Sequence, residues 1–125
     1  MTEKRITDSE SLSKVSYISI GQKVLQAEAQ ALTAIAKDLG RNFHDAVGCI
    51  LECKGRLVVI GVGKSGHIGR KISATLASTG TPSFFVHAGE ASHGDVGMIV
   101  EQDIVLALSN SGETQELVVL IPVLK

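Results

Sequence analysis

The feature that most constrains the fold is a short apolar run followed at once by a glycine-rich turn. Residues 57–60 read Leu-Val-Val-Ile, and residues 61–66 read Gly-Val-Gly-Lys-Ser-Gly. Consecutive apolar residues bounded by glycines are typical of a central parallel strand that is buried on both faces. Glycines let the backbone turn tightly into a helix and approach a ligand closely. We therefore expect a parallel α/β sheet with a binding site at the end of this strand.

The remaining periodicity predicts alternating helices and strands. Two amphipathic helices, residues 17–39 and 42–53, precede the first strand, and residues 1–16 are expected to be a flexible tail. After the first strand we expect a helix at 66–79, a strand at 83–86, a loop at 87–100, a strand at 103–108 and a helix at 114–124. This order predicts a three-layer, doubly wound parallel sheet with right-handed crossovers, preceded by an N-terminal helical pair.

Composition excludes several classes of protein. With 44% hydrophobic residues, the chain is not intrinsically disordered. Its 12 basic and 13 acidic residues nearly cancel, and aromatic residues make up only 3%, so we expect neither a nucleic-acid nor a membrane partner. The start of the chain lacks the apolar stretch of a signal peptide, and we expect a cytoplasmic protein. Cys49 and Cys53 are expected to be small buried hydrophobes, because nearby metal ligands are missing.

The first glycine loop fits two nucleotide-binding patterns incompletely. Residues 61–66 match Gly-x-Gly-x-x-Gly, but residues 86–88 supply no acidic side chain for a ribose hydroxyl. The P-loop pattern needs a glycine where the chain has Val58. With both nucleotide-binding patterns incomplete, what the sequence shows here is a glycine-rich turn that carries Lys64. Lys64 is either a solvated turn residue or, as we favour, a cation that faces an anionic ligand or a developing oxyanion.

The second candidate loop, residues 109–114, follows the third strand and is rich in hydroxyl groups. Ser109, Ser111 and Thr114 are typical of a neutral phosphate cradle at the start of a helix. The alternative is that Ser111 or Thr114 only caps that helix. Glu116 lies two residues further on, and it is either an ordinary first-turn charge or an acid/base group.

These stretches together resemble a known family. Four segments of the chain, at residues 61–71, 77–87, 89–98 and 109–114, are similar to the sugar isomerase (SIS) domain, and more narrowly to the arabinose-5-phosphate isomerases. The resemblance covers about residues 17–125 and implies a flavodoxin-like sheet.

The resemblance implies an aldose–ketose isomerase. Members interconvert D-ribulose 5-phosphate and D-arabinose 5-phosphate through a cis-enediol, and the product feeds the synthesis of Kdo, a sugar of lipopolysaccharide and of some capsules. A carboxylate moves a proton between C1 and C2 while a cation or hydrogen-bond donor stabilises the enediolate oxygen. This chemistry requires neither a cofactor nor a metal, and we expect neither.

Carried over by position, the resemblance assigns two groups of site residues. The catalytic group is Lys64, Glu116 and His93, and the group that binds sugar or phosphate is Gly63, Ser65, Ser109, Ser111 and Thr114. Two alternatives stay open for His87 and His93, which lie in the same loop as Asp95. Either His93 lines the active site or the three residues hold an adventitious metal ion, or the histidines hydrogen-bond the loop backbone. His67, at the start of a helix, is expected to be structural.

The chain is shorter than a full domain of the resembled family. We therefore expect residues 17–125 to be the N-terminal part of a SIS domain whose sheet is incomplete at the C-terminus, and to lack turnover alone. The resemblance implies that the family's further acid/base residues, including a second carboxylate and a histidine from a neighbouring subunit, lie in the remaining part. The resemblance further implies a homo-oligomer, typically a tetramer, when the protein is full length.

Two other functions compete with the isomerase. A non-catalytic sugar-phosphate sensor would use the same loops, although sensors with this domain carry a DNA-binding domain ahead of it, and too few residues precede the first helix. A dinucleotide-dependent oxidoreductase rests on the residues 61–66 pattern alone.

Overall fold

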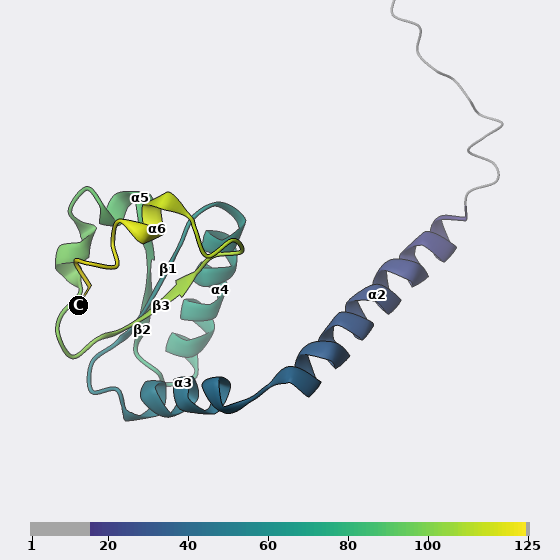
Figure 1. Ribbon diagram of the computed structural model, residues 1–125, viewed down its shortest axis with the longest axis horizontal. Helices are drawn as coiled ribbons and strands as arrows, with labels where there is room; N and C mark the ends of the chain where they lie inside the picture. The colour runs from purple at the N-terminus through teal and green to yellow at the C-terminus, as the bar shows by residue number, and fades with distance from the viewer. Residues whose placement is uncertain (1–15, 125) are drawn as a thin grey trace, which may run out of the picture. The chain divides into compact units, whose positions relative to one another are not determined.

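The computed structural model describes residues 16–124 (Figure 1). The chain divides after Asn42 into two compact units, which are described separately. The described part of the first unit is mainly the helix α2 (Tyr17–Asp38). Residues 1–15 of the expected tail lie outside the described residues. Ser16, the last residue of the expected tail, caps α2, because its side chain accepts a hydrogen bond from the Ser19 N–H at 3.2 Å.

Helix α2 confirms the predicted periodicity but buries none of its side chains. Its exposed apolar residues include Val24, Leu25, Leu32 and Ile35. The second predicted helix is also present, as α3 (Arg41–Glu52), and likewise has no buried residue. None of the helices in residues 16–124 combines the length and apolarity needed to cross a membrane.

Three parallel strands form the sheet predicted from the sequence. They are β1 (Leu57–Gly61), β2 (Ser83–His87) and β3 (Ile104–Leu108), in the spatial order β2-β1-β3. Every residue of β1 is buried, because this strand is central and covered on both faces. In the register, Val59 of β1 lies opposite Phe85 of β2 and Leu106 of β3.

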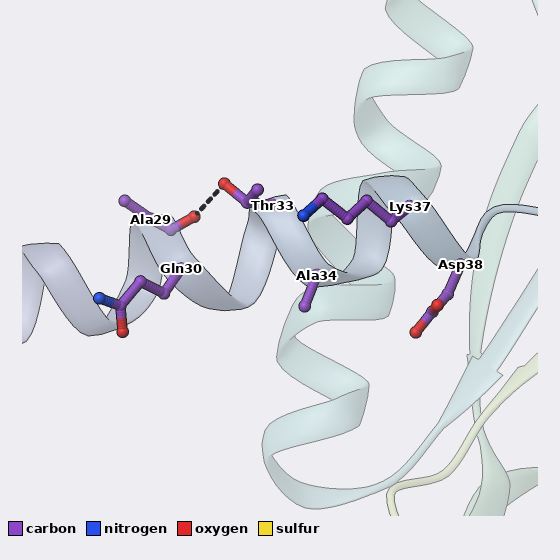
Figure 2. Close-up of a pocket in the computed structure, with 6 residues that line it drawn as sticks. All are labelled: Ala29, Gln30, Thr33, Ala34, Lys37 and Asp38. Carbon is purple, nitrogen blue, oxygen red and sulfur yellow. Dashed lines mark hydrogen bonds between the residues drawn. The ribbon is translucent and has the colours of Figure 1, made fainter.

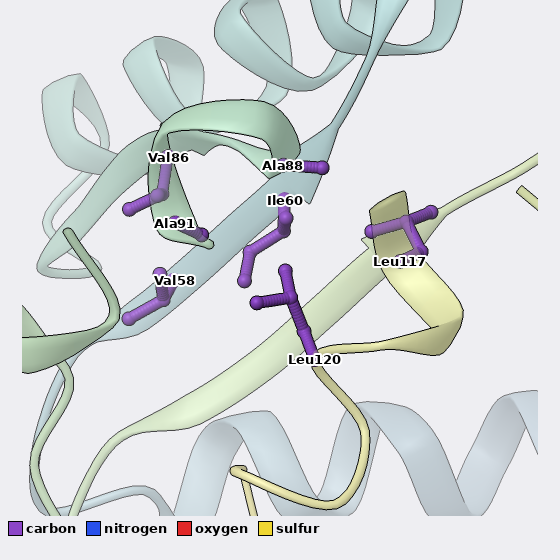
Figure 3. Packing of buried hydrophobic residues seen from close by; sticks show 7 residues of the cluster. All are labelled: Val58, Ile60, Val86, Ala88, Ala91, Leu117 and Leu120. Carbon is purple, nitrogen blue, oxygen red and sulfur yellow. The ribbon is translucent and has the colours of Figure 1, made fainter. Parts of the chain in front are cut away.

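Helices cover both faces of the sheet, which confirms the three-layer, doubly wound prediction (Figure 1). On one face α4 (Gly63–Ser78) contacts β1 and β2. The other face carries α5 (Ala88–Ala91) and α6 (Gln115–Val118). Figure 3 shows the core between this face and these two short helices, formed by Val58, Ile60, Val86, Ala88, Ala91, Leu117 and Leu120.

Two expected elements differ from the structure. The loop predicted at 87–100 contains α5 and a 3₁₀ helix, η1 (Asp95–Met98). Helix α5 forms because the His87 side chain accepts a hydrogen bond from the Gly89 N–H at 3.2 Å, and because its buried alanines complete the core. The helix predicted at 114–124 is only the single turn of α6, followed by further turns. Leu117 and Leu120 are nevertheless buried as an amphipathic helix would bury them.

An ion pair between the partly exposed Arg56 and the buried side chain of Asp103 joins the starts of β1 and β3. Asp103 accepts hydrogen bonds from the Arg56 N–H, Nε and Nη2 at 2.8, 3.2 and 2.7 Å, and from the Val100 N–H at 3.1 Å. The Arg56 guanidinium also donates to the Met98 carbonyl at 2.7 Å and lies 4.7 Å from the Phe84 ring centre in β2. The Arg56 side chain thus links the start of β1 to the start of β3 and to Phe84 of β2.

Candidate functional site

The candidate site lies where β1 and β3 end. A cleft of about 500 Å³ opens there, lined by Lys64, Ser65, Ile68, Leu108, Ser109 and Asn110. The first three residues belong to α4, which follows β1, and the others end β3 or follow it. Because β1 connects through α4 to β2 on one side and pairs with β3 on the other, the strand order reverses between β1 and β3. Ligands in open parallel sheets bind at such a reversal, at the carboxyl ends of the strands.

Glycines bring α4 close enough to the sheet to place Lys64 and Ser65 at the cleft. A Cβ on Gly66 would lie 3.2 Å from the Gly61 carbonyl oxygen, and one on Gly69 would lie 3.0 Å from the Phe85 ring. Both distances are shorter than ordinary carbon contacts, so any other residue would push the helix outward. Glycines in this segment are therefore needed for α4 to pack closely against the sheet. Those of the Gly-x-Gly-x-x-Gly pattern also leave backbone N–H groups accessible to a ligand.

Helix α4 starts three residues earlier than the sequence predicted. The expected start was residue 66, whereas the helix begins at Gly63 after the extended residue Val62. Gly63 has a φ of +57°, a conformation that favours glycine. The glycine turn is thus mostly the first turn of the helix. As a result, Lys64 and Ile68 are one helical turn apart and face the cleft together.

Hydrogen bonds between its own residues hold the hydroxyl loop in shape. The Ser109 and Thr114 hydroxyl oxygens lie 2.7 Å apart, and Ser109 Oγ also accepts from the Gly112 N–H at 3.0 Å. Ser111 Oγ accepts from the Glu113 N–H at 3.1 Å. Gly112 has a φ of +73°, which lets the loop turn back so that Ser109 meets Thr114.

The capping alternative for these hydroxyls is wrong. Thr114 occupies the N-cap position of α6, but its side chain makes no capping hydrogen bond and contacts Ser109 instead. Ser111 bonds the loop residue Glu113, which lies outside the helix. Because α6 is a single turn, its dipole contributes little, and the expected help from a helix N-terminus is reduced at this loop.

The structure gathers only part of the predicted site. Lys64, Ser65 and Ser109 line the cleft, and Thr114 is tied to Ser109. The remaining predicted residues, Glu116, His93, Ser111 and Gly63, are exposed and do not line it. Glu116 lies in the first turn of α6, and His93 follows α5 with its N–H bonded to the Glu90 carbonyl at 2.9 Å.

Three residues of the cleft were missed by the sequence analysis. Ile68 and Leu108 supply apolar surface, and Asn110 adds an amide beside Ser109. The signal for Ile68 was its position one helical turn after Lys64. Asn110 was not predicted, because a phosphate cradle was expected to use the hydroxyl groups on either side of it.

The histidines and cysteines singled out in the sequence have different surroundings in the structure. His87 hydrogen-bonds the loop backbone through Nδ1, as one alternative held. Within residues 16–124, no group of three His, Cys, Asp or Glu side chains is arranged to hold a metal ion. The expectation of two buried cysteines is wrong for Cys49, which is exposed, while Cys53 is half-buried with its Sγ 3.5 Å from the Gln102 carbonyl.

A hollow on α2 carries no comparable chemistry. All of its lining residues come from the surface of that one helix, as Figure 2 shows: Ala29, Gln30, Thr33, Ala34, Lys37 and Asp38. The Thr33 hydroxyl donates to the Ala29 carbonyl at 2.8 Å, so its hydrogen-bonding capacity is used within the helix.

Solved structures share this fold. A protein of Bacteroides fragilis NCTC 9343, described as a candidate phosphosugar isomerase involved in capsule formation, superposes with a TM-score of 0.83 and 42% identity, over 87% of this chain and 58% of that one. The protein c3406 of Escherichia coli CFT073, solved in complex with arabinose 5-phosphate, gives a TM-score of 0.74 and 42% identity, over 88% of this chain and 60% of that one.

Curated relatives are similar over most of this chain. Arabinose 5-phosphate isomerase KdsD of Yersinia pestis is 58% identical over 111 residues, which are 89% of this chain and 34% of the relative. The Pseudomonas aeruginosa protein of the same name is 55% identical over 109 residues, 87% of this chain and 33% of the relative. The chain thus spans about a third of the length of the curated relatives it matches.

A family profile matches the part of the chain that forms the sheet and the cleft. The profile is that of the SIS domain, and the match covers residues 50–125, more than half of the chain. The cleft at the β1–β3 reversal, the glycine-packed crossover and this match agree, and the chain belongs to the SIS domain family.

Proposed function

We propose that this chain is the N-terminal part of the catalytic domain of an aldose–ketose isomerase that interconverts D-arabinose 5-phosphate and D-ribulose 5-phosphate. The observation that carries the proposal is the pairing of Lys64 with Ser109 in one cleft. A cation and a hydroxyl loop at the same sheet edge suit a small anionic sugar. The names of the curated relatives and the arabinose 5-phosphate bound to the E. coli neighbour support the same substrate.

In the proposed binding mode, the hydroxyl loop holds the phosphate group. The Ser109 and Thr114 hydroxyls already point toward each other, so a phosphate oxygen needs only to replace their mutual hydrogen bond. Ser65 and Asn110 face the same cleft and would contact sugar hydroxyls. Ile68 and Leu108 would reduce the exposure of the cleft to water, which strengthens hydrogen bonds to the ligand.

The proposed reaction moves two protons within the sugar, one from C2 to C1 and one from O2 to O1. Glu116 takes the proton from C2 of the aldose, the C2–H electrons form the C1–C2 double bond, and negative charge collects on O1. The Lys64 ammonium stabilises that enediolate oxygen, and His93 assists the transfer of the hydroxyl protons. Glu116 then returns its proton to C1 while the O2–H proton passes to O1, which leaves a ketone at C2 and a hydroxymethyl group at C1.

The assignment of Glu116 and His93 to this reaction rests on the family resemblance alone. Neither residue lines the cleft that the described residues form. The chain alone is therefore expected to bind the sugar phosphate without converting it. The full-length protein would be a cytoplasmic homo-oligomer, in the proposal a tetramer, with neither nucleic acid nor membrane as a partner. Its product would feed Kdo synthesis for lipopolysaccharide or capsule.

A chimera tests the proposal directly. The segment of the Yersinia pestis relative that aligns with this chain is replaced by the matching residues of this chain, and conversion of arabinose 5-phosphate is measured. The proposal expects activity, and it expects Glu116→Gln to abolish turnover while binding persists. A matched control is Glu113→Gln, an exposed carboxylate of the preceding loop. A folded chimera that turns over no sugar phosphate would contradict the isomerase.

A non-catalytic sugar-phosphate module remains a second candidate. It is favoured by one observation, namely that the cleft lining contains a cation and hydroxyls but no carboxylate. Selective binding of arabinose 5-phosphate by a chimera that does not convert it would support this candidate.

A further inference from the structure

A second hollow lies beside the N-terminus of α4, on the side away from the cleft. It is lined by Gly63, Gly66, His67, Arg70, Phe85 and His87. The cleft described above lies between α4 and β3, whereas this hollow lies between α4 and the end of β2. Since β2 and β3 flank β1 on opposite sides, the two depressions are separate, and they share no lining residue.

Helix geometry explains why the two depressions have different side chains. Lys64 and Ile68 are four residues apart and face the cleft. The pairs Gly63–His67 and Gly66–Arg70 have the same spacing but lie on another face of the helix. The first two turns of α4 therefore present one cation to each side of the helix, Lys64 to the cleft and Arg70 to the hollow.

The hollow is lined by basic side chains, and two of them, Arg70 and His87, make contacts that position them. Half of its lining residues are Arg or His, and none is acidic. The Arg70 guanidinium stacks 4.4 Å from the Phe85 ring centre, and no carboxylate of residues 16–124 forms a salt bridge with it. His87 Nδ1 accepts the Gly89 N–H, so the neutral ring carries its proton on Nε2, which is left as a donor.

Size and backbone geometry favour a single small anionic group. The hollow measures about 140 Å³, below the ~300–1,000 Å³ of pockets for whole organic ligands. A Cβ at Gly63 would meet nothing within 4 Å, so the backbone at the start of α4 is open on this side. The guanidinium of arginine is suited to planar, two-point recognition of carboxylates and phosphates.

We propose that this hollow is a second oxyanion site, which binds the phosphate or carboxylate group of a ligand other than the sugar phosphate in the cleft. Arg70 supplies the charge, and His67 and His87 supply further donors. His67 is thus given a binding role in place of the structural one expected from the sequence. The proposal does not depend on the isomerase, because the two depressions have no residue in common.

Amide NMR spectra of the ¹⁵N-labelled chain, titrated with sodium phosphate, sodium acetate or sodium chloride at equal ionic strength, test the proposal. We expect phosphate or acetate, but not chloride, to shift the amides of Gly66, Phe85 and His87 with saturation. A phosphate response identifies a phosphorylated ligand and an acetate response a carboxylate. Arg70→Gln is expected to lower the affinity for the anion, measured from the saturating amide shifts, at least tenfold. The matched control, Lys71→Gln, removes a neighbouring exposed cation outside the hollow and should leave the response unchanged.

Two further variants keep the test decisive. Ser109→Ala should alter phosphate shifts at the cleft and leave those at Phe85 and His87 intact. His67→Gln, an exposed change, gives a second test of the hollow if Arg70→Gln fails to fold. The proposal is overturned if the hollow amides respond equally to chloride, or if their response is the same in wild type, Arg70→Gln and His67→Gln.

Discussion

The hydroxyl oxygens of Ser109 and Thr114 lie 2.7 Å apart, although five residues separate them in the chain. The left-handed conformation of Gly112 closes the loop, and its N–H donates to the same Ser109 oxygen. The loop is therefore shaped before any ligand arrives. A preorganised loop binds a phosphate without the entropy loss of ordering flexible residues.

Ser109→Ala should weaken the binding of arabinose 5-phosphate at least about tenfold, because hydrogen bonds to charged groups contribute ~1.5–3 kcal/mol. Thr114 would also lose its partner and the loop its Gly112 contact. Thermal-shift titration of the chain with arabinose 5-phosphate, with ribose and inorganic phosphate as references, measures the change. Ser78→Ala is the control, since this exposed hydroxyl bonds only within α4. Equal affinities of the two variants would remove Ser109 from the phosphate site.

Lys64→Met should lower turnover in the Yersinia pestis chimera by ~10²–10³-fold, the usual effect of removing one oxyanion donor. Methionine keeps the unbranched stem and most of its length without the charge, and α4 should remain folded because Lys64 is exposed. Steady-state kinetics distinguish catalysis from binding: kcat should fall more than KM rises. Lys71→Met, on the same helix but outside the cleft, should behave like the wild type. A change confined to KM would make Lys64 a binding residue instead.

The succession of helices and strands along the chain and the layers of the sheet were predictable because their signals are local. The apolar run at β1 is long enough only for a short strand, and alternation with helices requires parallel pairing. The short helix α5 was not predictable in this way. It depends on the His87 side chain as a cap and on Ala88 and Ala91 fitting under the sheet, and such contacts leave no periodic pattern.

The candidate site was predictable in its chemistry but only partly in its geometry. Lys64 and Ser109 were found because each follows a strand that ends at the same sheet edge. The start of α4 at Gly63 was missed, because glycine is a poor helix former and its low propensity concealed the first turn. The Ser109–Thr114 contact was missed because it depends on the φ of Gly112.

Gly69→Ala should destabilise the fold, whereas Gly48→Ala should stabilise it. Both glycines lie inside helices, where alanine is favoured by up to ~1 kcal/mol. A Cβ at Gly69 would lie 3.0 Å from the Phe85 ring and 3.1 Å from Val59 Cγ1, while one at Gly48 would meet nothing within 4 Å. Overpacking of this kind costs ~1–3 kcal/mol. Urea unfolding of both variants measures the difference. Equal stabilisation by both changes would mean that α4 is not packed against β1 and β2 as described.

Asp103 should make the fold sensitive to acid. Hydrogen bonds from Arg56 are the main cause that lowers the pKa of this carboxyl from 3.8 to about 2, with further help from the Val100 and Arg56 N–H groups. The side chain of Asp103 has no exposed surface. Because the folded pKa lies below the unfolded one, the stabilisation is complete above about pH 4 to 5 and is lost as pH falls toward 2. One pKa unit corresponds to about 1.4 kcal/mol. Because Arg56 is partly exposed and water screens the pair, we expect less than this full conversion, a loss of about 1–2 kcal/mol.

Urea unfolding at pH 7, 5, 4 and 3 isolates this contribution when the wild type is compared with Asp103→Asn. At pH 7 the variant should be the less stable, because Asn cannot replace the charge that Arg56 faces. The gap between the two unfolding free energies should narrow between pH 5 and 3, because the Asp103 carboxyl of the unfolded wild type takes up a proton in that range and the variant has no such group. Glu101→Gln removes a nearby exposed carboxylate and should show a small gap that does not change with pH. If the gap for Asp103→Asn stays constant down to pH 3, the ion pair across the starts of β1 and β3 does not contribute to stability.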